Sequence, residues 1–256
     1  YNPPTTDIFL TRGGPKARRP SGYQLDFSYH TNRQKSVVFG MGAHTYHDAA
    51  NGVFYSVSAG VDWNPLPNLS LSVEPEFARQ YEPAQYVDTV EDASAVKTFG
   101  NRYVFGEMDQ TELNMNIRLS WTFTPKLSLQ LYMQPLMSHG DFHHFKEFSR
   151  PGTFDFHEYS AAELDRNGDD YNVSPQNGNG ESFSFSDPDF YYKSLRGNAV
   201  LRWEYRPGST LYLVWTQART EDDYYRQFQF QNAMSDLWRS PVNNIFMVKM
   251  TYWLNL

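Results

Sequence analysis

The feature that most constrains the fold of this chain is the strict alternation of apolar and polar side chains across residues 111–134. Successive side chains of a β-strand point to opposite faces of a sheet, so the alternation predicts strands with one apolar and one polar face. A break at residues 124–126 separates two such strands and predicts a β-hairpin. Either protein or lipid must cover its apolar face. That face consists of Leu113, Met115, Ile117, Leu119, Trp121, Phe123, Leu127, Leu129, Leu131 and Met133.

The same alternation recurs along most of the chain and predicts about ten antiparallel strands of roughly ten residues, the length that a tilted transmembrane strand requires. An even number of strands is typical of bacterial outer-membrane barrels. Besides the hairpin, the alternating segments are residues 23–30, 37–44, 53–63, 69–77, 199–205, 211–216 and 246–254.

The composition limits how the apolar faces can be covered. The chain has 256 residues, of which 40% are hydrophobic and 17% aromatic, enough for a sizeable protein core. It has no run of about 18 apolar residues, which excludes a transmembrane helix. The net charge of -7 argues against binding of nucleic acid, and the absence of cysteine excludes disulfides and thiolate metal sites. Because the sequence begins without Met or a signal peptide, we expect a mature or trimmed chain.

The lengths of the connections favour a membrane barrel. Every second connection is short, at the breaks near Thr31, Pro65, Pro125 and Pro207. Apart from a modest link near Ala49, the others are long loops, near residues 79–104, 139–192 and 221–243. Barrels of the bacterial outer membrane have short periplasmic turns and long extracellular loops. The sequence therefore predicts a single β-barrel domain over residues 1–256, with its long loops outside the cell.

Aromatic side chains help to choose between a membrane barrel and a soluble barrel or sandwich. In an outer-membrane barrel, aromatic residues form girdles at the membrane surface, whereas a soluble core would place them towards strand centres. The predicted fold class is therefore an all-β, antiparallel transmembrane outer-membrane β-barrel, surrounded by outer-membrane lipid and lipopolysaccharide. The aromatic residues next to short turns or the chain end are Trp63, Trp121, Phe123, Trp203, Tyr205, Tyr252 and Trp253.

Lipid on the apolar faces would turn the charged residues of the polar faces towards a lumen. These residues have both signs, and buried charges are costly unless they are paired or hydrated. They would either pair across the interior and plug it, or line a water path, and both alternatives stay open because they depend on barrel width. The predicted lumen-facing residues are Glu74, Glu76, Arg118, Arg202, Glu204 and Lys249.

Four segments, residues 102–111, 123–132, 194–210 and 248–253, resemble the barrel region of a bacterial outer-membrane family called domain of unknown function 5916. The resemblance covers most of residues 23–256. Members of that family carry an N-terminal domain similar to family-nine carbohydrate-binding modules ahead of the barrel. The resemblance therefore implies an outer-membrane location, and it implies that this chain is the C-terminal section of a larger barrel.

The most suggestive chemical motif lies in the longest predicted loop. Asp165, Asn167 and Asp169 offer oxygen atoms at alternate positions, as a calcium-binding loop requires. The match is partial, because Asp170 replaces the usual glycine and Gln176 replaces the bidentate glutamate. The alternative is a solvated acidic turn. Further oxygen ligands for calcium are available from Glu163, Asp187 and Asp189.

A second group contains His139, His143 and His144. Two imidazoles four residues apart can share a metal ion on a helix, but this segment lies beside Phe142 and Phe145 and has a strand-like pattern. We therefore interpret the histidines as polar residues at the base of an aromatic loop. The adjacent serine offers a hydroxyl, but no spacing motif of a hydrolase accompanies it, so no enzyme is predicted.

These observations predict a channel or surface-binding protein of the outer membrane for small polar or saccharide-like ligands. The saccharide part rests on the family resemblance alone. A structural or assembly barrel, whose extracellular loops bind a partner protein, is the alternative, and a barrel hydrolase is a distant third.

Overall fold

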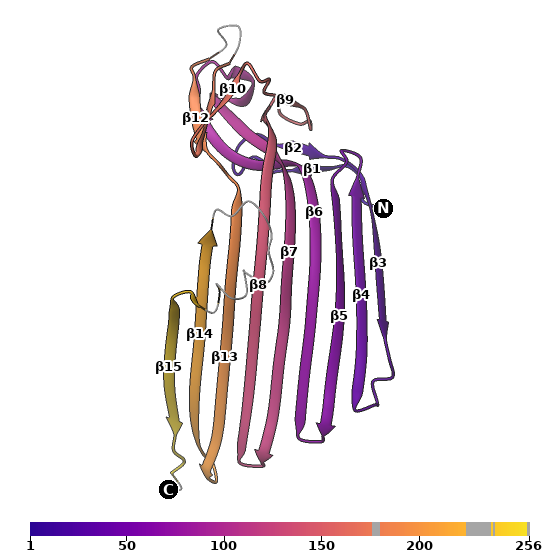
Figure 1. Cartoon of the computed structure of the whole chain (residues 1–256), viewed down its shortest axis with the longest axis vertical. Helices are drawn as coiled ribbons and strands as arrows, with labels where there is room; N and C mark the ends of the chain where they lie inside the picture. The colour runs from indigo at the N-terminus through magenta and orange to yellow at the C-terminus, as the bar shows by residue number, and fades with distance from the viewer. Residues whose placement is uncertain (176–179, 224–236, 238, 255–256) are drawn as a thin grey trace.

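A computed structural model describes residues 1–175, 180–223, 237 and 239–254 of the chain. Its main element is a ten-stranded antiparallel sheet in which nine strands follow one another in chain order, as a single curved layer (Figure 1). The tenth, β9, pairs with β8 at one end. The nine strands are β3 (Gly22–His30), β4 (Val37–Asp48), β5 (Val53–Leu66), β6 (Leu69–Glu91), β7 (Asn101–Thr124), β8 (Leu127–Phe148), β13 (Phe190–Arg206), β14 (Ser209–Asp223) and β15 (Val242–Thr251).

The strand register confirms the alternation predicted from the sequence. Residues directly opposite each other on neighbouring strands share a face, so each row of partners crosses the sheet on one side. One row defines the apolar face and consists of Trp63, Leu71, Leu119, Leu131, Ala199, Trp215 and Phe246. The next row defines the polar face and consists of Asp62, Ser72, Arg118, Tyr132, Asn198 and Thr216.

The closed barrel predicted from the sequence is not found in the described part of the chain. β3 and β15 are the two edges of the sheet, and they do not pair with each other. In the described residues, nine strands follow one another across the sheet and β9 pairs only with β8, so the number of crossing strands is not the even number expected. Alternation fixes the face on which each side chain lies, but closure depends on strand number and stagger, which alternation does not encode.

Short turns gather at one end of the sheet, together with the C-terminal end of β15, as predicted (Figure 1). Proline or glycine lies in three of these turns, whereas the turn at residues 31–36 contains neither. Pro207 and Gly208 connect β13 to β14, and Gly208 has φ of +75°, a conformation that glycine adopts without strain. Pro125 occupies the two-residue turn between β7 and β8. The first hairpin predicted from the sequence is therefore confirmed.

The other end of the sheet is more ordered than the long loops predicted there. β6, β7 and β8 contain 23, 24 and 22 residues and continue through much of residues 79–104 and into residues 139–192. The predicted loop boundaries were thus too wide, and much of residues 221–243 lies outside the described residues. The rest of the second region forms short strands, β9 (Phe156–Glu158), β10 (Leu164–Asn167), β11 (Asp170–Val173) and β12 (Phe183–Ser186).

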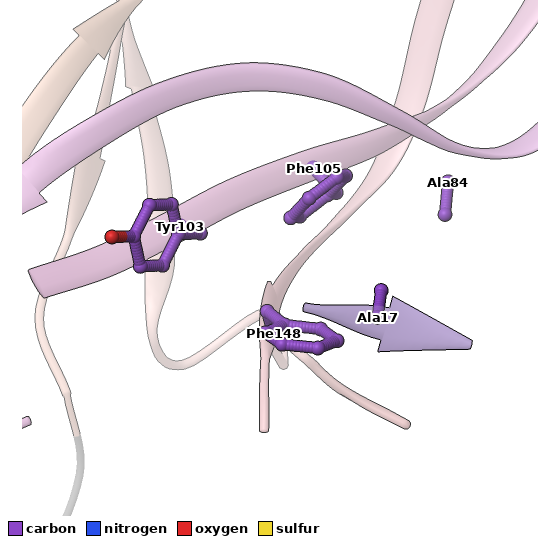
Figure 2. Close-up of a cluster of buried hydrophobic side chains, with 5 residues drawn as sticks. All are labelled: Ala17, Ala84, Tyr103, Phe105 and Phe148. Carbon is purple, nitrogen blue, oxygen red and sulfur yellow. The ribbon is translucent and has the colours of Figure 1, made fainter. Parts of the chain in front are cut away.

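These short strands, the extensions of β6 to β8 and an N-terminal hairpin form a compact unit that we call the cap (Figure 1). The hairpin consists of β1 (Thr5–Asp7) and β2 (Ala17–Arg19), and a 3₁₀ helix, η1 (Val96–Thr98), lies between β6 and β7. The cap contains two hydrophobic clusters. Figure 2 shows the first, with Ala17, Ala84, Tyr103, Phe105 and Phe148. The second contains Val104, Phe145, Tyr159, Val173 and Phe185.

The two clusters explain why the sequence pattern fails in the cap. Tyr103 and Phe105 belong to one cluster and Val104 to the other, so β7 is covered on both faces. A strand buried on both faces reads as a continuous apolar run instead of an alternation. Each buried phenylalanine contributes about 1.5–3 kcal/mol, so the cap has a conventional protein core.

The sheet below the cap has no comparable core in the described residues. Large apolar side chains of its apolar face remain exposed, including Leu25 at 72%, Phe27 at 61%, Phe246 at 75% and Val248 at 68%. No described helix is both apolar and long enough to cross a membrane. An apolar face of this extent on an uncovered sheet marks a surface that contacts lipid or another protein.

Candidate functional site

The register places all six charged residues predicted to face a lumen on the polar face. Glu74 and Glu76 of β6 lie opposite Asn116 and Asn114 of β7. Arg202 lies opposite Tyr212, which in turn lies opposite Lys249. Arg118 belongs to the row that defines the polar face, and Glu204 is two residues beyond Arg202 on the same strand. The sequence pattern thus brings these six side chains to one side of the sheet.

The polar face contains a depression of about 520 Å³ that crosses strands β5 to β8 and β13. Asp62 and Arg118 line it with opposite charges, and Tyr132, Gln130 and Asn198 add hydrogen-bonding groups. A concave site with a few polar groups of this kind is typical of a small-molecule site. The sequence identified Arg118, but grouping it with the other lining residues required the cross-strand register.

Hydrogen bonds hold several of these side chains in position. The Tyr132 hydroxyl donates to Asn116 Oδ1 at 2.8 Å, and Asn198 Nδ2 donates to Thr216 Oγ1 at 3.1 Å. The Arg118 guanidinium lies 5.5 Å from the centroid of the Tyr132 ring, an arrangement that favours a cation–π contact. The depression is therefore lined by groups whose orientation is set by their neighbours.

Most charges on the polar face are not neutralised by a close partner. Among the described residues, Glu74, Glu76 and Arg118 form no ion pair within 4.0 Å. Arg202 Nη2 lies 3.6 Å from Glu204 Oε2, while the Lys249 ammonium lies 6.0 Å from the centroid of the Tyr212 ring. Because an unpaired charge is stable only in contact with water, this face requires hydration.

The predicted calcium ligands lie in a tight hairpin of the cap instead of an open loop. Asp165 and Asn167 belong to β10, and Asp169 lies in the turn to β11. Arg166, between them, pairs with Asp187 and brings a positive charge into the hairpin. Gln176 lies outside the described residues. Asp189, a further candidate, accepts a hydrogen bond from the backbone N–H of Phe142 at 2.6 Å. Calcium binding at this hairpin stays a prediction.

A different part of the cap brings a carboxylate and two imidazoles together, and we call it the bulge cluster. It consists of Glu107 on β7 and of His143 and His144 on β8, whose ligand atoms all lie within 4.8 Å of one another. His144 Nδ1 is 3.0 Å from Glu107 Oε2, and His143 Nε2 is 3.6 Å from the same oxygen. Among the described residues, these three side chains form the one group of three or more His, Cys, Asp or Glu residues that could hold a metal ion.

A β-bulge creates this arrangement. Glu107 pairs with His143 and Phe105 with Lys146, so two residues of β8 oppose one residue of β7. His144, in the bulge, has φ of +46°, a left-handed conformation that is uncommon outside glycine. In a regular strand the two neighbouring imidazoles would point to opposite faces, but here both reach the same carboxylate.

Hydrogen bonds keep the Glu107 carboxylate charged. Burial alone would raise its pKa, but Lys146 Nζ donates to Oε1 at 2.9 Å and the Tyr81 hydroxyl donates to Oε2 at 2.7 Å. Together with His144, these donors lower the pKa of Glu107 to about 2. Burial and the bond to Glu107 raise the pKa of Tyr81 to about 12, so its hydroxyl stays a donor.

Of the three histidines grouped from the sequence, His139 is thus separate, whereas His143 and His144 stay together. His139 lies in the ordered part of β8, 5.7 Å from the ring centroid of Tyr191, and its Nδ1 is 3.7 Å from Asp141 Oδ2. None of the three lies in a loop base, because β8 continues through residue 148. The sequence missed Glu107 as a partner, since no pattern in it marks the bulge that aligns the two strands.

The fold and its two faces define an all-β protein, built as one antiparallel meander with an exposed apolar face, a polar face and an ordered cap. The chain belongs to the family described as Domain of unknown function (DUF5916), which it matches over residues 1–256. No curated protein and no solved structure matches the chain.

Proposed function

We propose that this chain forms the wall of an outer-membrane β-barrel, with lipid on its apolar face and water on its polar face, and that it admits or binds small polar, saccharide-like ligands. The observation that carries the proposal is the uncovered sheet itself. One face exposes large apolar side chains along both edge strands, β3 and β15. The other face carries charges that require hydration. A bilayer beside an aqueous lumen satisfies both faces.

Aromatic residues near the short-turn end support this orientation. Trp63, Trp121, Phe123 and Trp203 are all exposed, and the Trp121 and Phe123 rings lie 4.3 Å apart. Exposed indole and phenyl rings are unfavourable in water but are enriched at the level of lipid head groups. Together they would form the periplasmic girdle of the barrel, and the cap would lie outside the cell.

The two edges of the sheet indicate that further strands complete the barrel. β3 and β15 expose apolar side chains and one row of backbone N–H and C=O groups each, which a bilayer does not tolerate. Additional strands of a longer chain would satisfy both edges, as the resemblance to larger family barrels implies. A wider barrel would also leave room for water along the polar face.

The depression on the polar face is suited to a saccharide-like ligand. Asp62 can accept hydrogen bonds from hydroxyl groups, and Arg118 can donate hydrogen bonds to them. The Tyr132 ring lies in the lining of the same depression. Neither charged group is neutralised by an ion pair within 4.0 Å in the described part of the chain, so both are available to a ligand. This favours uncharged or zwitterionic polar molecules over strongly charged ones.

Liposome swelling tests the proposal with the full-length protein in phospholipid vesicles. We expect sugars of increasing size to enter at decreasing rates, and we expect Arg118→Ala to change the rate for small sugars at least threefold. The matched control is Ile117→Ala, because Ile117 lies on the apolar face of the same strand and does not line the depression. Vesicles that remain impermeable to water-soluble solutes, in both swelling and single-channel conductance, would contradict the channel.

The ordered cap favours the second candidate, a barrel whose extracellular part binds a partner protein. The cap has two hydrophobic clusters of its own, which gives it a fixed surface that flexible loops lack. Under this alternative, vesicles would show no conductance, and removal of residues 149–189 would abolish a complex without affecting barrel assembly. Unchanged complex formation after that deletion would exclude it.

A further inference from the structure

We propose that the bulge cluster binds a divalent transition-metal ion such as Zn²⁺, with Glu107, His143 and His144 as ligands and Asp109 as the fourth. Three of the separations between the relevant nitrogen and oxygen atoms are already close to the required spacing. Zinc bonds to nitrogen and oxygen of about 2.0–2.1 Å place the ligand atoms of a tetrahedral site about 3.4 Å apart. The observed separations are 3.0 Å and 3.6 Å from Glu107 Oε2 to the two imidazoles, and 3.9 Å from His143 Nε2 to Asp109 Oδ2.

The backbone at the bulge gives an independent reason to expect a function. A left-handed conformation at a residue other than glycine is strained and persists where the surrounding structure requires it. His144 adopts this conformation, and a regular strand at this position would remove one of the two imidazoles from the cluster. The strained backbone at His144 therefore keeps both imidazoles in the proposed site.

The surroundings of Glu107 resemble those of a metal-binding carboxylate. Ligands in metal sites are usually oriented by hydrogen bonds from neighbouring side chains. Lys146 binds Oε1 and Tyr81 binds Oε2, so the carboxylate is fixed with Oε2 facing both imidazoles. The Lys146 charge opposes a cation, but the carboxylates of Glu107 and Asp109 outweigh it.

The ligand set and its exposure define the class of ion. Two imidazoles with carboxylate oxygens suit Zn²⁺, Cu²⁺ or Ni²⁺, whereas Ca²⁺ and Mg²⁺ prefer oxygen alone. The side chains of His144 and Asp109 are 61% and 44% exposed, so an ion can enter from solvent. The calcium site predicted at the β10–β11 hairpin is distinct from this site, because none of its residues belongs to the bulge cluster.

Titration calorimetry with Zn²⁺ on the full-length protein in detergent tests the proposal. We expect one ion per chain at this site, and at least a 100-fold loss of affinity in His143→Gln and in His144→Asn. Asparagine tolerates the left-handed conformation, so His144→Asn removes the imidazole without removing the bulge. The control is His157→Gln, because His157 is exposed and lies beside Glu163 at 3.3 Å but outside the cluster.

Two further measurements separate ligation from a general structural effect. Tyr81→Phe removes only the hydroxyl that orients Glu107, so the affinity should fall about 10–100-fold while all ligands remain. The electron paramagnetic resonance spectrum of the Cu²⁺-loaded wild-type protein should show coupling to two nitrogen atoms, and this result does not depend on any variant folding. Unchanged affinity in both histidine variants, or coupling to one nitrogen or none, would overturn the site.

Discussion

Replacing Ile117 with arginine tests what covers the apolar face. Ile117 lies on β7 with Val73 opposite it on one side and Met133 on the other, and all three belong to the apolar face. The alternating apolar positions of this strand run from residue 113 to residue 123, so Ile117 is near the middle of the band. If lipid covers the face, this side chain lies close to the bilayer midplane.

The expected cost follows from that depth. Arginine on the lipid-facing side of an outer-membrane barrel costs about 2–4 kcal/mol near the midplane and about 0–1 kcal/mol near the interfaces. The folding equilibrium of Ile117→Arg should therefore shift by roughly 30- to 700-fold. On a surface in contact with water, the same substitution should stay within about 0.5 kcal/mol.

The matched control places the same side chain on the opposite face of the same strand. Asn114 lies opposite Glu76, and its Nδ2 donates to Glu112 Oε1 at 3.2 Å. An arginine at this position would have two carboxylates nearby, so we expect Asn114→Arg to change stability by less than about 1 kcal/mol. The difference between the two variants then reports the environment of the face instead of the tolerance of the strand.

Reversible unfolding by urea from phospholipid vesicles, carried out on the full-length protein, measures both free energies of unfolding. A lipid-covered apolar face predicts a large loss for Ile117→Arg and a small change for Asn114→Arg. Equal and small changes in the two variants would refute it, because water would then contact both faces. A larger loss in Asn114→Arg would refute it too, since the polar face would then be the covered one.

Three further predictions concern the cap and the polar face. Phe105 is fully buried and its ring centroid lies 5.1 Å from that of Phe156, so Phe105→Ala should destabilise the cap by about 3–5 kcal/mol, measured as faster proteolysis within the cap at unchanged protection of the sheet. Hydrogen bonds from Ser94 and Arg102 lower the pKa of Asp92 from 3.8 to about 2. Since the folded value lies below the unfolded one, Asp92 stabilises the cap above about pH 4 and this contribution is lost as the pH falls towards 2, which should be visible as a flatter acid-unfolding curve in Asp92→Asn. On the polar face, Arg118→Glu replaces a positive charge with a negative one and should shift the reversal potential in a salt gradient towards cation selectivity, and an unchanged reversal potential would remove Arg118 from the ion path.

Much of the sheet could be predicted from the sequence, because one physical rule governs it. A strand with one covered face alternates apolar and polar residues, and the hairpin of β7 and β8 follows from that rule together with the turn at Pro125. The rule fails where both faces of a strand are covered, as at Tyr103, Val104 and Phe105, so the cap was predicted as loop.

The candidate sites show the same division. The charged residues of the polar face follow from alternation alone, whereas the contact of Asp62 with the depression around Arg118 depends on the register of three strands. The bulge cluster depends on a single extra residue in β8, which brings His143 and His144 to Glu107. An insertion of one residue leaves the composition and period of a strand almost unchanged, so the sequence does not reveal it.

The central claim is that hydrocarbon contacts the apolar face, and spin-label accessibility measures this residue by residue. The chain contains no cysteine, so single cysteines can be introduced in turn at positions 113–123 of the full-length protein in vesicles and labelled. We predict that labels at odd positions collide mainly with oxygen, which concentrates in lipid, and that labels at even positions collide mainly with a water-soluble nickel complex. Labels at odd positions that are shielded from both reagents, or as accessible to the nickel complex as their neighbours, would contradict the account.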